Sequence, residues 1–431
     1  MGNAERWSGG LAFIIAAIGC AVGIGNIWRF PYIMGQNGGL AFLIPYLACV
    51  ALFGIPMIAL EIGAGMHFSS SYFEVLKRIR FPKAIGAFPL LLVFFILSYY
   101  VVITSWMLFY SFGFFAGMDV NFSVISGGYY SVFFLLATVF LMYVVLSLGI
   151  HRGVEPFMKL AIALLAIFMA ALAAHTLSQP DAFAKTLSSL SFDASFILLP
   201  KTWLFAVSQA VFSLSIGMGL LLTYASYVKR KEGALRDAVV IAAADTSVSL
   251  LAVLVVFPLV FLAGFSINEG TLLSMDALPL AFANMPFGGL AGGVFFLCIF
   301  IAAFTSALSM AELQITALES EKGMPRQKAV NYALFALLAV SLIVLLSYSP
   351  MNWSLFGMPL LDLLDYLFGT LLAPLSALVV CVALGHYWKT EQFLIMMRVR
   401  EKWLQEAIAL LVKLVIPLVL AGLFLHGVLG G

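Results

Sequence analysis

The first long apolar run of this chain, residues 10–35, is interrupted near its middle by polar and helix-breaking residues. Its segment 18–31 holds three glycines, an asparagine, an arginine and a proline. In a lipid environment each unpaired backbone group costs several kcal/mol, so such a break is tolerated only where the freed groups line a cavity or bind something. The run therefore predicts a membrane-crossing segment that is broken in order to build a site.

A later apolar run, residues 202–227, carries a related break. Its segment 213–219 reads Ser-Leu-Ser-Ile-Gly-Met-Gly. Two interrupted helices in corresponding positions of two halves indicate the binding site of a secondary transporter.

Composition places the rest of the chain in the membrane as well. Hydrophobic residues make up 63% of the sequence and charged residues 10%, with a mean hydropathy of +1.10, whereas soluble domains carry about 25% charge. The net charge of +2 favours no nucleic-acid partner; the lipid bilayer is the expected surrounding. We predict an all-α polytopic membrane protein with about 11 transmembrane helices. Windows of about 20 apolar residues place the spans at 10–35, 39–65, 85–113, 131–149, 156–177, 202–227, 237–264, 288–318, 328–347, 356–387 and 406–427.

Lysines and arginines set the expected orientation, because cytoplasmic loops are enriched in them. Apart from Lys185 and Lys201, the loops between the basic ones are nearly free of these residues. The pattern predicts a prokaryotic inner-membrane protein with a cytoplasmic N-terminus and, after an odd number of spans, an extracytoplasmic C-terminus. The basic loops are 66–84, 152–159, 229–236, 322–328 and 389–402.

The position of the breaks, in spans 1 and 6, predicts an internal repeat. Residues 10–177 and 202–387 would each hold five spans and enter the membrane from opposite sides, giving a 5+5 inverted repeat. The helix at 406–427 would lie outside this repeat, and residues 1–431 would form one transporter domain. The four cysteines and five histidines show neither zinc-ligand nor disulfide spacing, and there is no nucleophile–base pair, so an enzyme is not expected.

The breaks also predict chemistry. Freed carbonyls near residues 19–22 suit a hard cation such as Na+, and amides near 23–25, at a half-helix N-terminus, suit an anionic carboxylate. Asn26 adds an amide oxygen to the first break, and Ser213 and Ser215 add hydroxyls to the second. The eighth span holds two further hydroxyls, on Thr305 and Ser306. In a membrane helix, the hydroxyls of Thr305 and Ser306 can alternatively bond back to their own i−4 carbonyls.

Three carboxylates lie in or at the ends of spans: Asp245, Asp362 and Asp365. Intramembrane carboxylates usually face a polar interior, since one at a span centre costs on the order of 2.5–3.5 kcal/mol. Arg29 and Asp365 would lie toward the outer ends of their spans, where they pair across a cavity mouth or snorkel separately to the surface.

Taken together, these residues resemble the neurotransmitter:sodium symporter family, in particular its prokaryotic amino-acid branch. The resemblance extends over nearly the whole chain and is most specific in the first span. It rests on Trp7, Gly19, Ala21-Val22-Gly23, Gly25-Asn26, Trp28-Arg29-Phe30-Pro31-Tyr32, Asn37-Gly38-Gly39, Pro45-Tyr46, Glu61, Tyr99-Tyr100, Ser208-Gln209-Ala210, Phe212-Ser213, Thr223-Tyr224, Thr305-Ser306 and Asp365.

The resemblance implies two sodium sites and one substrate site. It implies that one Na+ would be held by Ala21, Asn26, Ser213 and Asp245 with the substrate carboxylate, and the other by Gly19, Val22, Ala302, Thr305 and Ser306. It implies that the substrate would be bound by Ala21, Gly23, Ile24, Gly25, Ile96, Tyr100, Phe212, Ser213, Ser215, Met218, Ser306 and Met310.

The resemblance further implies gates. Arg29, Asp365 and Phe212 would close the outer side, and the segment with Arg6 and Trp7 the inner side. The family's inner gate pairs an Arg three residues before the Trp with an Asp in span 8, but this chain has Ala4 and Ser320 there. We therefore expect a shifted pair of Arg6 with Glu319 or Glu321.

Substrate chemistry follows from the same positions. Position 23 is Gly where amine-transporting relatives hold Asp, so the ligand must bring its own carboxylate, as an α-amino acid does. Met218 and Met310 have flexible side chains that adapt to different ligands. They favour an apolar L-amino acid, either an aromatic one (Trp, Tyr or Phe) or one the size of Leu. Asp245 stands where chloride-dependent relatives hold Asn, so chloride independence is expected.

The expected activity is sodium-coupled symport by alternating access; the alternatives are a proton-coupled carrier and a non-transporting amino-acid sensor.

Overall fold

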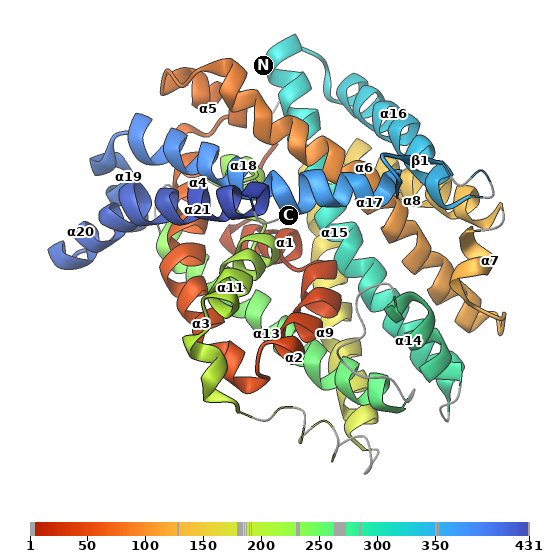
Figure 1. The fold of residues 1–431 in the computed structure, drawn as a ribbon. Helices are drawn as coiled ribbons and strands as arrows, with labels where there is room; N and C mark the ends of the chain where they lie inside the picture. Colours follow the sequence, from red (N-terminus) through yellow and green to blue (C-terminus); the bar gives the residue numbers. More distant parts are fainter. Residues whose placement is uncertain are drawn as a thin grey trace.

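The chain folds into a bundle of long helices (Figure 1). The computed structural model describes residues 5–429, with the exception of 127–128, 179–183, 185, 187, 189, 191, 230–232, 263–272, 284–286, 350 and 352. Within these residues, nine helical segments are long and apolar enough to cross a membrane. One bent pair of half-helices, 10–21 with 25–36, passes the same test as a tenth span. A second pair of half-helices, 200–213 and 220–226, lies where the sixth span was predicted, and the predicted all-α polytopic fold is confirmed.

The N-terminal part begins with one of these pairs. The segments 10–21 and 25–36 are bent by 54° at the break between them. The elements of this part are α1 (Gly10–Ala21), η1 (Gly25–Arg29), α2 (Phe30–Gln36), η2 (Leu40–Phe42), α3 (Leu43–Cys49), η3 (Val50–Gly54), α4 (Ile55–Phe68), α5 (Tyr72–Arg78), α6 (Lys83–Phe115), α7 (Phe122–Ser126), α8 (Tyr130–Ser147), η4 (Ile150–Val154) and α9 (Glu155–Leu177).

The C-terminal part contains the second pair, α11 and α12, which a six-residue break separates. Its elements are η5 (Ala194–Leu198), α11 (Pro200–Ser213), α12 (Leu220–Ser226), α13 (Ala234–Leu262), α14 (Leu273–Ala283), α15 (Gly288–Lys322), α16 (Arg326–Leu345), η6 (Leu346–Tyr348), β1 (Ser354–Leu355), β2 (Met358–Pro359), α17 (Leu360–Leu364), η7 (Asp365–Leu371), α18 (Ala373–Val382), η8 (Ala383–Tyr387), α19 (Thr390–Met397), α20 (Lys402–Leu410), η9 (Leu411–Val415) and α21 (Ile416–Leu429).

One predicted boundary is wrong. The tenth span was expected to begin at residue 356, but its helix begins at Leu360. The preceding residues form a short antiparallel hairpin in which Ser354 pairs with Pro359 and Leu355 with Met358. Phe356 and Gly357 form the turn with φ of 53° and 80°, the left-handed values that two-residue hairpin turns require. The apolar residues of this hairpin extended the apolar window of the sequence, so the predicted span began too early.

Burial separates the centre of the bundle from its edge. The most apolar window of α15 is 89% buried inside the protein, whereas that of the segment 402–429 is 22% buried. Figure 1 accordingly shows α15 in the middle of the bundle and α20 at its margin. A helix that is apolar on all sides and buried by protein belongs to the core of a large membrane protein, so α15 is positioned to contribute to a central site.

Candidate functional site

The break in the first span frees backbone amides, which donate hydrogen bonds to side chains. α1 ends at Ala21, and Val22 follows in an extended conformation with ψ of 120°. The Gly23 amide donates to Asn26 Oδ1 at 2.9 Å, and the Ile24 amide donates to the Tyr100 hydroxyl at 3.3 Å. These bonds satisfy groups that a continuous helix would have paired internally. They hold the break open in one defined geometry.

Two glycines at this break are required because side chains of other helices approach them closely. A methyl group built on Gly23 would lie 2.9 Å from the Tyr100 hydroxyl and 3.0 Å from Ser306 Oγ. One built on Gly25 would lie 2.7 Å from the Phe212 ring. A side chain at either position would displace the neighbours that line the cavity described below.

The break between α11 and α12 is longer and has a different backbone. Ser215, Gly217 and Gly219 have φ of 50°, 75° and 76°, values that glycine adopts without a steric penalty. The Gly217 amide donates to Glu61 Oε1 at 2.6 Å, and Ser376 Oγ donates to the Gly217 carbonyl at 2.8 Å. Residues from two other spans therefore hold this unwound segment.

Sequence reasoning did not assign these two supports. Glu61 entered only as part of the family pattern, although a carboxylate inside an apolar run was an available signal. Ser376 gave no signal, because a single serine in a membrane helix usually bonds back to its own helix.

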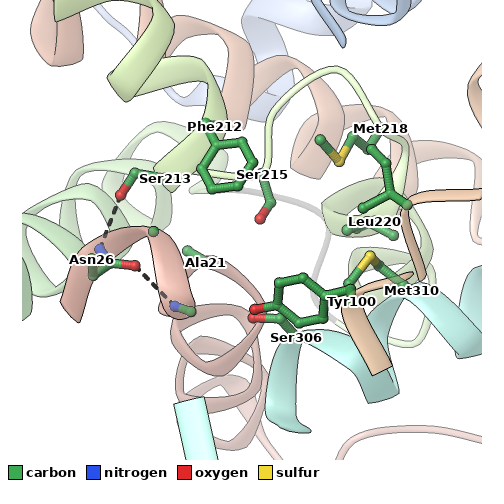
Figure 2. A pocket seen from close by; sticks show the side chains of 13 residues that line it. Ala21, Asn26, Tyr100, Phe212, Ser213, Ser215, Met218, Leu220, Ser306 and Met310 are labelled. Atoms are coloured by element: carbon green, nitrogen blue, oxygen red, sulfur yellow. Dashed lines mark hydrogen bonds between the residues drawn. The ribbon is translucent and has the colours of Figure 1, made fainter. Parts of the chain in front are cut away.

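The two breaks enclose a small cavity with an uncharged lining (Figure 2). Eleven of the twelve predicted substrate residues line it; Ile24 does not, although its amide contacts Tyr100. Asn26 and Leu220 complete the lining, and Leu220 was not predicted. The eleven are Ala21, Gly23, Gly25, Ile96, Tyr100, Phe212, Ser213, Ser215, Met218, Ser306 and Met310.

The cavity has a polar end and an apolar end. Figure 2 shows Asn26 and Ser213 together on one side and Met218, Leu220 and Met310 together on the other. Its volume is about 40 Å³, room for about three water molecules at one probe sphere of 10–15 Å³ each. A ligand larger than this needs side chains to move, and the two methionines can do so because an unbranched thioether has many accessible rotamers.

Beside the polar end lies a buried cluster around Asp245 of α13. Asn26 Nδ2 donates to Asp245 Oδ1 at 2.6 Å and to Ser213 Oγ at 2.9 Å, and Ser213 Oγ donates to Asp245 Oδ2 at 2.6 Å. Asn26 and Asp245 are fully buried. The structure thus brings together three residues from η1, α11 and α13 that are up to 219 positions apart.

This cluster fits a sodium ion in the chemistry of its donors. A carboxylate, a hydroxyl and an amide oxygen are hard ligands of the kind that alkali and alkaline-earth cations prefer. In this structure the Asn26 amide presents its nitrogen to Asp245 and its oxygen to Gly23. A 180° rotation of the Asn26 amide would turn its oxygen, rather than its nitrogen, toward Asp245. The same residues could then coordinate an ion instead of bonding to one another.

The second predicted ion cluster lies where α15 crosses the end of α1. Ser306 Oγ donates to the Val22 carbonyl at 3.0 Å, and Thr305 Oγ1 donates to the Ala302 carbonyl at 2.9 Å. A methyl group on Gly19 would lie 3.4 Å from Thr305 Cβ. The five predicted residues are therefore neighbours. Both hydroxyls also bond back to the Ala302 carbonyl of their own helix, at 2.9 Å for Thr305 and 3.3 Å for Ser306, as the alternative foresaw.

More polar groups surround Asp245 than sequence reasoning assigned to it. Asn26 Nδ2 also reaches Ser249 Oγ at 2.9 Å. The Tyr46 hydroxyl lies beside Ser213, Thr246 and Ser249, in the field of the Asp245 carboxylate. Within the described part of the chain, buried oxygens without a hydrogen-bond partner are found here on Tyr46, Gln209 and Thr246.

The predicted outer gate is only partly assembled. Arg29 stacks over the Phe212 ring, with its guanidinium carbon 4.8 Å from the ring centre, and donates to Ser208 Oγ at 3.2 Å. It forms no direct ion pair with Asp365, whose carboxylate instead lies with the Tyr99 hydroxyl against Gly369. Arg29 thus contacts Phe212, which lines the cavity, and Asp365 takes no part in this contact.

The inner side differs from the expectation. Arg6 forms no ion pair with Glu319 or Glu321, and Glu321 pairs with Lys83. Burial gives the reason, because Glu5 is partly buried, Arg6 exposed and Trp7 buried. In a non-helical strand of chain, neighbouring side chains point to opposite sides, so Arg6 faces outward. Ala4 lies outside the described residues.

A different network closes this side. Arg326 pairs with Glu312 through two bonds of 2.8 and 2.9 Å and with Glu5 at 3.3 Å. The Tyr227 hydroxyl donates to Glu312 at 2.7 Å, and Trp7 Nε1 donates to the Tyr224 carbonyl at 2.7 Å. Sequence reasoning did not predict Glu5, Glu312 and Arg326 as partners. Glu312 could have been found, because it is a carboxylate inside the predicted span 288–318.

Two broken helices around an uncharged cavity, with oxygen clusters at their ends, define the architecture of a secondary transporter. A family model described as the sodium:neurotransmitter symporter family matches residues 4–122 and 122–429. The chain belongs to this family, whose members are transporters.

Individual relatives agree with this assignment. The chain is 30% identical over 418 residues to an uncharacterized sodium-dependent transporter of Haemophilus influenzae, covering 90% of each chain. It is 28% identical over 437 residues to the sodium-dependent serotonin transporter of Drosophila melanogaster, covering 89% of this chain and 69% of that one. The crystal structure of MhsT in complex with L-phenylalanine matches with a TM-score of 0.88 and 29% identity, over 99% of this chain and 100% of that one.

Proposed function

We propose that this protein is a sodium-coupled symporter of apolar L-α-amino acids that works without chloride. The observation that carries the proposal is the cavity lining, which contains no charged side chain. A zwitterionic ligand fits such a site, because its carboxylate and ammonium groups can be met by backbone groups and by a co-transported ion.

The two ends of the cavity support this division of tasks. Its polar end adjoins the Asp245 cluster, so a substrate carboxylate bound there would share a sodium ion with Asn26, Ser213 and Asp245. Ion and substrate would then stabilise each other, a reciprocal coupling. Its apolar end would take the substrate side chain, and the complex of the relative MhsT with L-phenylalanine supports a large apolar one.

Asp245 supports chloride independence. Its fixed negative charge stands among Tyr46, Ser213 and Ser249, so no anion is needed there to balance the sodium ion. For transport, we propose that the side bearing Glu5 and Trp7 is cytoplasmic in the inner membrane of a prokaryote. Release to that side requires the Arg326 network to open.

The test is uptake of radiolabelled L-amino acids into proteoliposomes under an inward Na+ gradient, with K+ replacing Na+ as the control. Sodium-dependent accumulation of Leu, Phe, Tyr or Trp is expected, unchanged when gluconate replaces chloride. Accumulation driven by a pH gradient alone would contradict sodium coupling and assign Asp245 to a proton. Binding without uptake would contradict transport and favour a sensor.

A further inference from the structure

A second cavity lies next to the N-terminal segment, away from the central site. It has a volume of about 670 Å³ and is lined by three separate parts of the chain. These are the N-terminal segment, the link between α8 and α9, and the link that follows α12. The lining residues are Glu5, Arg6, Trp7, Ser8, Leu148, His151, Arg152 and Lys229.

The charges around this cavity are unbalanced. Arg6, Arg152 and Lys229 are exposed, and none of them forms an ion pair with any described residue. Glu5 is the one carboxylate of the lining, and it is already engaged by Arg326 and by the Ile150 amide. A second carboxylate, Glu155, bonds Ser8 and approaches His151 behind the lining, but Lys159 pairs with it at 2.6 Å. The cavity thus collects three fixed positive charges, and His151 adds a further donor at its edge.

A neighbouring cavity shows that this imbalance is local. It shares Arg6 and Lys229 but is also lined by Glu74 and Glu319, so both signs of charge face its interior. Other cations expected on the same side, such as Lys77 and Arg78, pair with Glu74 on their own helix. Topology alone requires basic residues on this side of the membrane; it does not require three segments to direct unpaired ones into one space.

We propose that this cavity binds a phosphate group, carried either by the headgroup of an anionic phospholipid or by a free phosphate compound. Guanidinium groups offer forked donors that match phosphate oxygens, and an ammonium group adds a point charge. Basic pockets at the cytoplasmic ends of membrane helices take anionic headgroups. Leu148, 56% exposed at the rim, offers an apolar contact for a lipid.

The position of the cavity gives the bound phosphate a structural consequence. Arg6 belongs to the segment that Trp7 and Glu5 anchor, whereas Arg152 belongs to η4 and Lys229 to the link after α12. A phosphate bridging them would tie the base of α1 to both links. Its cytoplasmic location rests on the orientation proposed above, but the binding itself does not.

The test compares two triple variants of the purified protein in detergent. R6Q/R152Q/K229Q removes the three cavity cations, and R80Q/K322Q/K402Q removes three exposed cations that do not line the cavity. One arm titrates sodium pyrophosphate by isothermal titration calorimetry. The other measures phosphatidylglycerol retained from mixed phosphatidylglycerol–phosphatidylcholine vesicles, by native mass spectrometry.

The cavity variant is expected to bind at least about tenfold more weakly than the wild type, in line with the loss of charge-assisted bonds, while the control variant binds normally. Pyrophosphate binding would assign a free phosphate compound, and retained phosphatidylglycerol alone would assign a lipid. Equal loss in both variants, or no binding in either arm, would overturn the proposal. If the triple variant does not fold, R152Q and K229Q are measured singly, and each must weaken binding.

Discussion

The two broken helices differ in how the backbone groups freed at each break are hydrogen-bonded. The break after α1 is three residues long, and its groups are bonded to side chains of Asn26, Tyr100 and Ser306. The break between α11 and α12 is six residues long, carries three left-handed residues, and is held by Glu61 and Ser376. The first is a compact set of polar bonds, whereas the second is a loop that exposes Met218 to the cavity.

This difference indicates that the two breaks have different functions, one toward the ion and the other toward the substrate side chain. In the proposed function, the first break would supply ion ligands, whose positions must be well defined. The second would form one wall of the space for the substrate side chain, where a loop with glycines at both ends of Met218 can adapt. Changes at the first break should therefore alter ion dependence, and changes at the second should alter folding or substrate choice.

The largest expected effect lies in the second break. In Gly217→Ala the new methyl group would lie 2.1 Å from Ala377 Cα, a backbone atom that cannot move aside, and φ is +75°. The left-handed conformation alone costs about 1–2 kcal/mol. We expect loss of the folded monodisperse protein in size-exclusion chromatography, or loss of uptake. Gly422→Ala, with nothing within 4 Å, is the control; normal behaviour of both variants would refute the close contact.

Next comes the ion cluster at the first break. Asp245→Asn replaces a buried carboxylate that accepts bonds from Asn26 and Ser213. Bonds to charged groups contribute about 1.5–3 kcal/mol, so the sodium concentration for half-maximal uptake should rise by about ten- to a hundredfold. We also expect uptake by this variant to depend on chloride, which would replace the lost negative charge. The order of preference among amino acids should not change. The exposed Ser247→Ala on the same helix serves as control, and an unchanged sodium dependence of Asp245→Asn would remove Asp245 from the ion site.

A moderate effect is expected at the support of the second break. Glu61→Ala leaves the buried Gly217 amide without its acceptor, which costs about 1–3 kcal/mol, whereas Glu61→Gln keeps an acceptor oxygen. The thermal unfolding midpoint in detergent should fall clearly for the alanine variant and less for glutamine. Equal midpoints for the two variants would mean that this bond does not hold the loop.

The smallest effect is a change of substrate choice. Met218→Ala enlarges the apolar end of the cavity, so uptake of Trp relative to Leu should rise by about fourfold, the equivalent of one additional buried methylene at about 0.8 kcal/mol. Sodium dependence should stay the same. Met351→Ala, at a residue that is 75% exposed outside the cavity, is the control. A shift in sodium dependence without a shift in substrate choice would reverse the proposed division between the two breaks.

The accuracy of sequence reasoning followed the range of the interactions. Gly23 and Asn26 could be recognised because a break leaves local signals, namely glycines and polar residues within an apolar run. The bond between Glu5 and Arg326 could not, because the partners are far apart in sequence and several other charges compete for each of them. The expected pair of Arg6 with Glu319 or Glu321 was wrong for the same reason, since the direction of the chain before Trp7 decides which side chains face inward.

The sequence by itself determined that this chain lies in a membrane, where its spans fall and which two of them break. These features depend on hydrophobicity and on backbone breakers over about twenty residues, and the bilayer acts on each span separately. The tertiary structure alone decided that Glu5 meets Arg326, that Glu61 supports Gly217 and that Arg29 covers Phe212 rather than pairing with Asp365. Such contacts depend on how the helices pack against one another, which no short segment encodes.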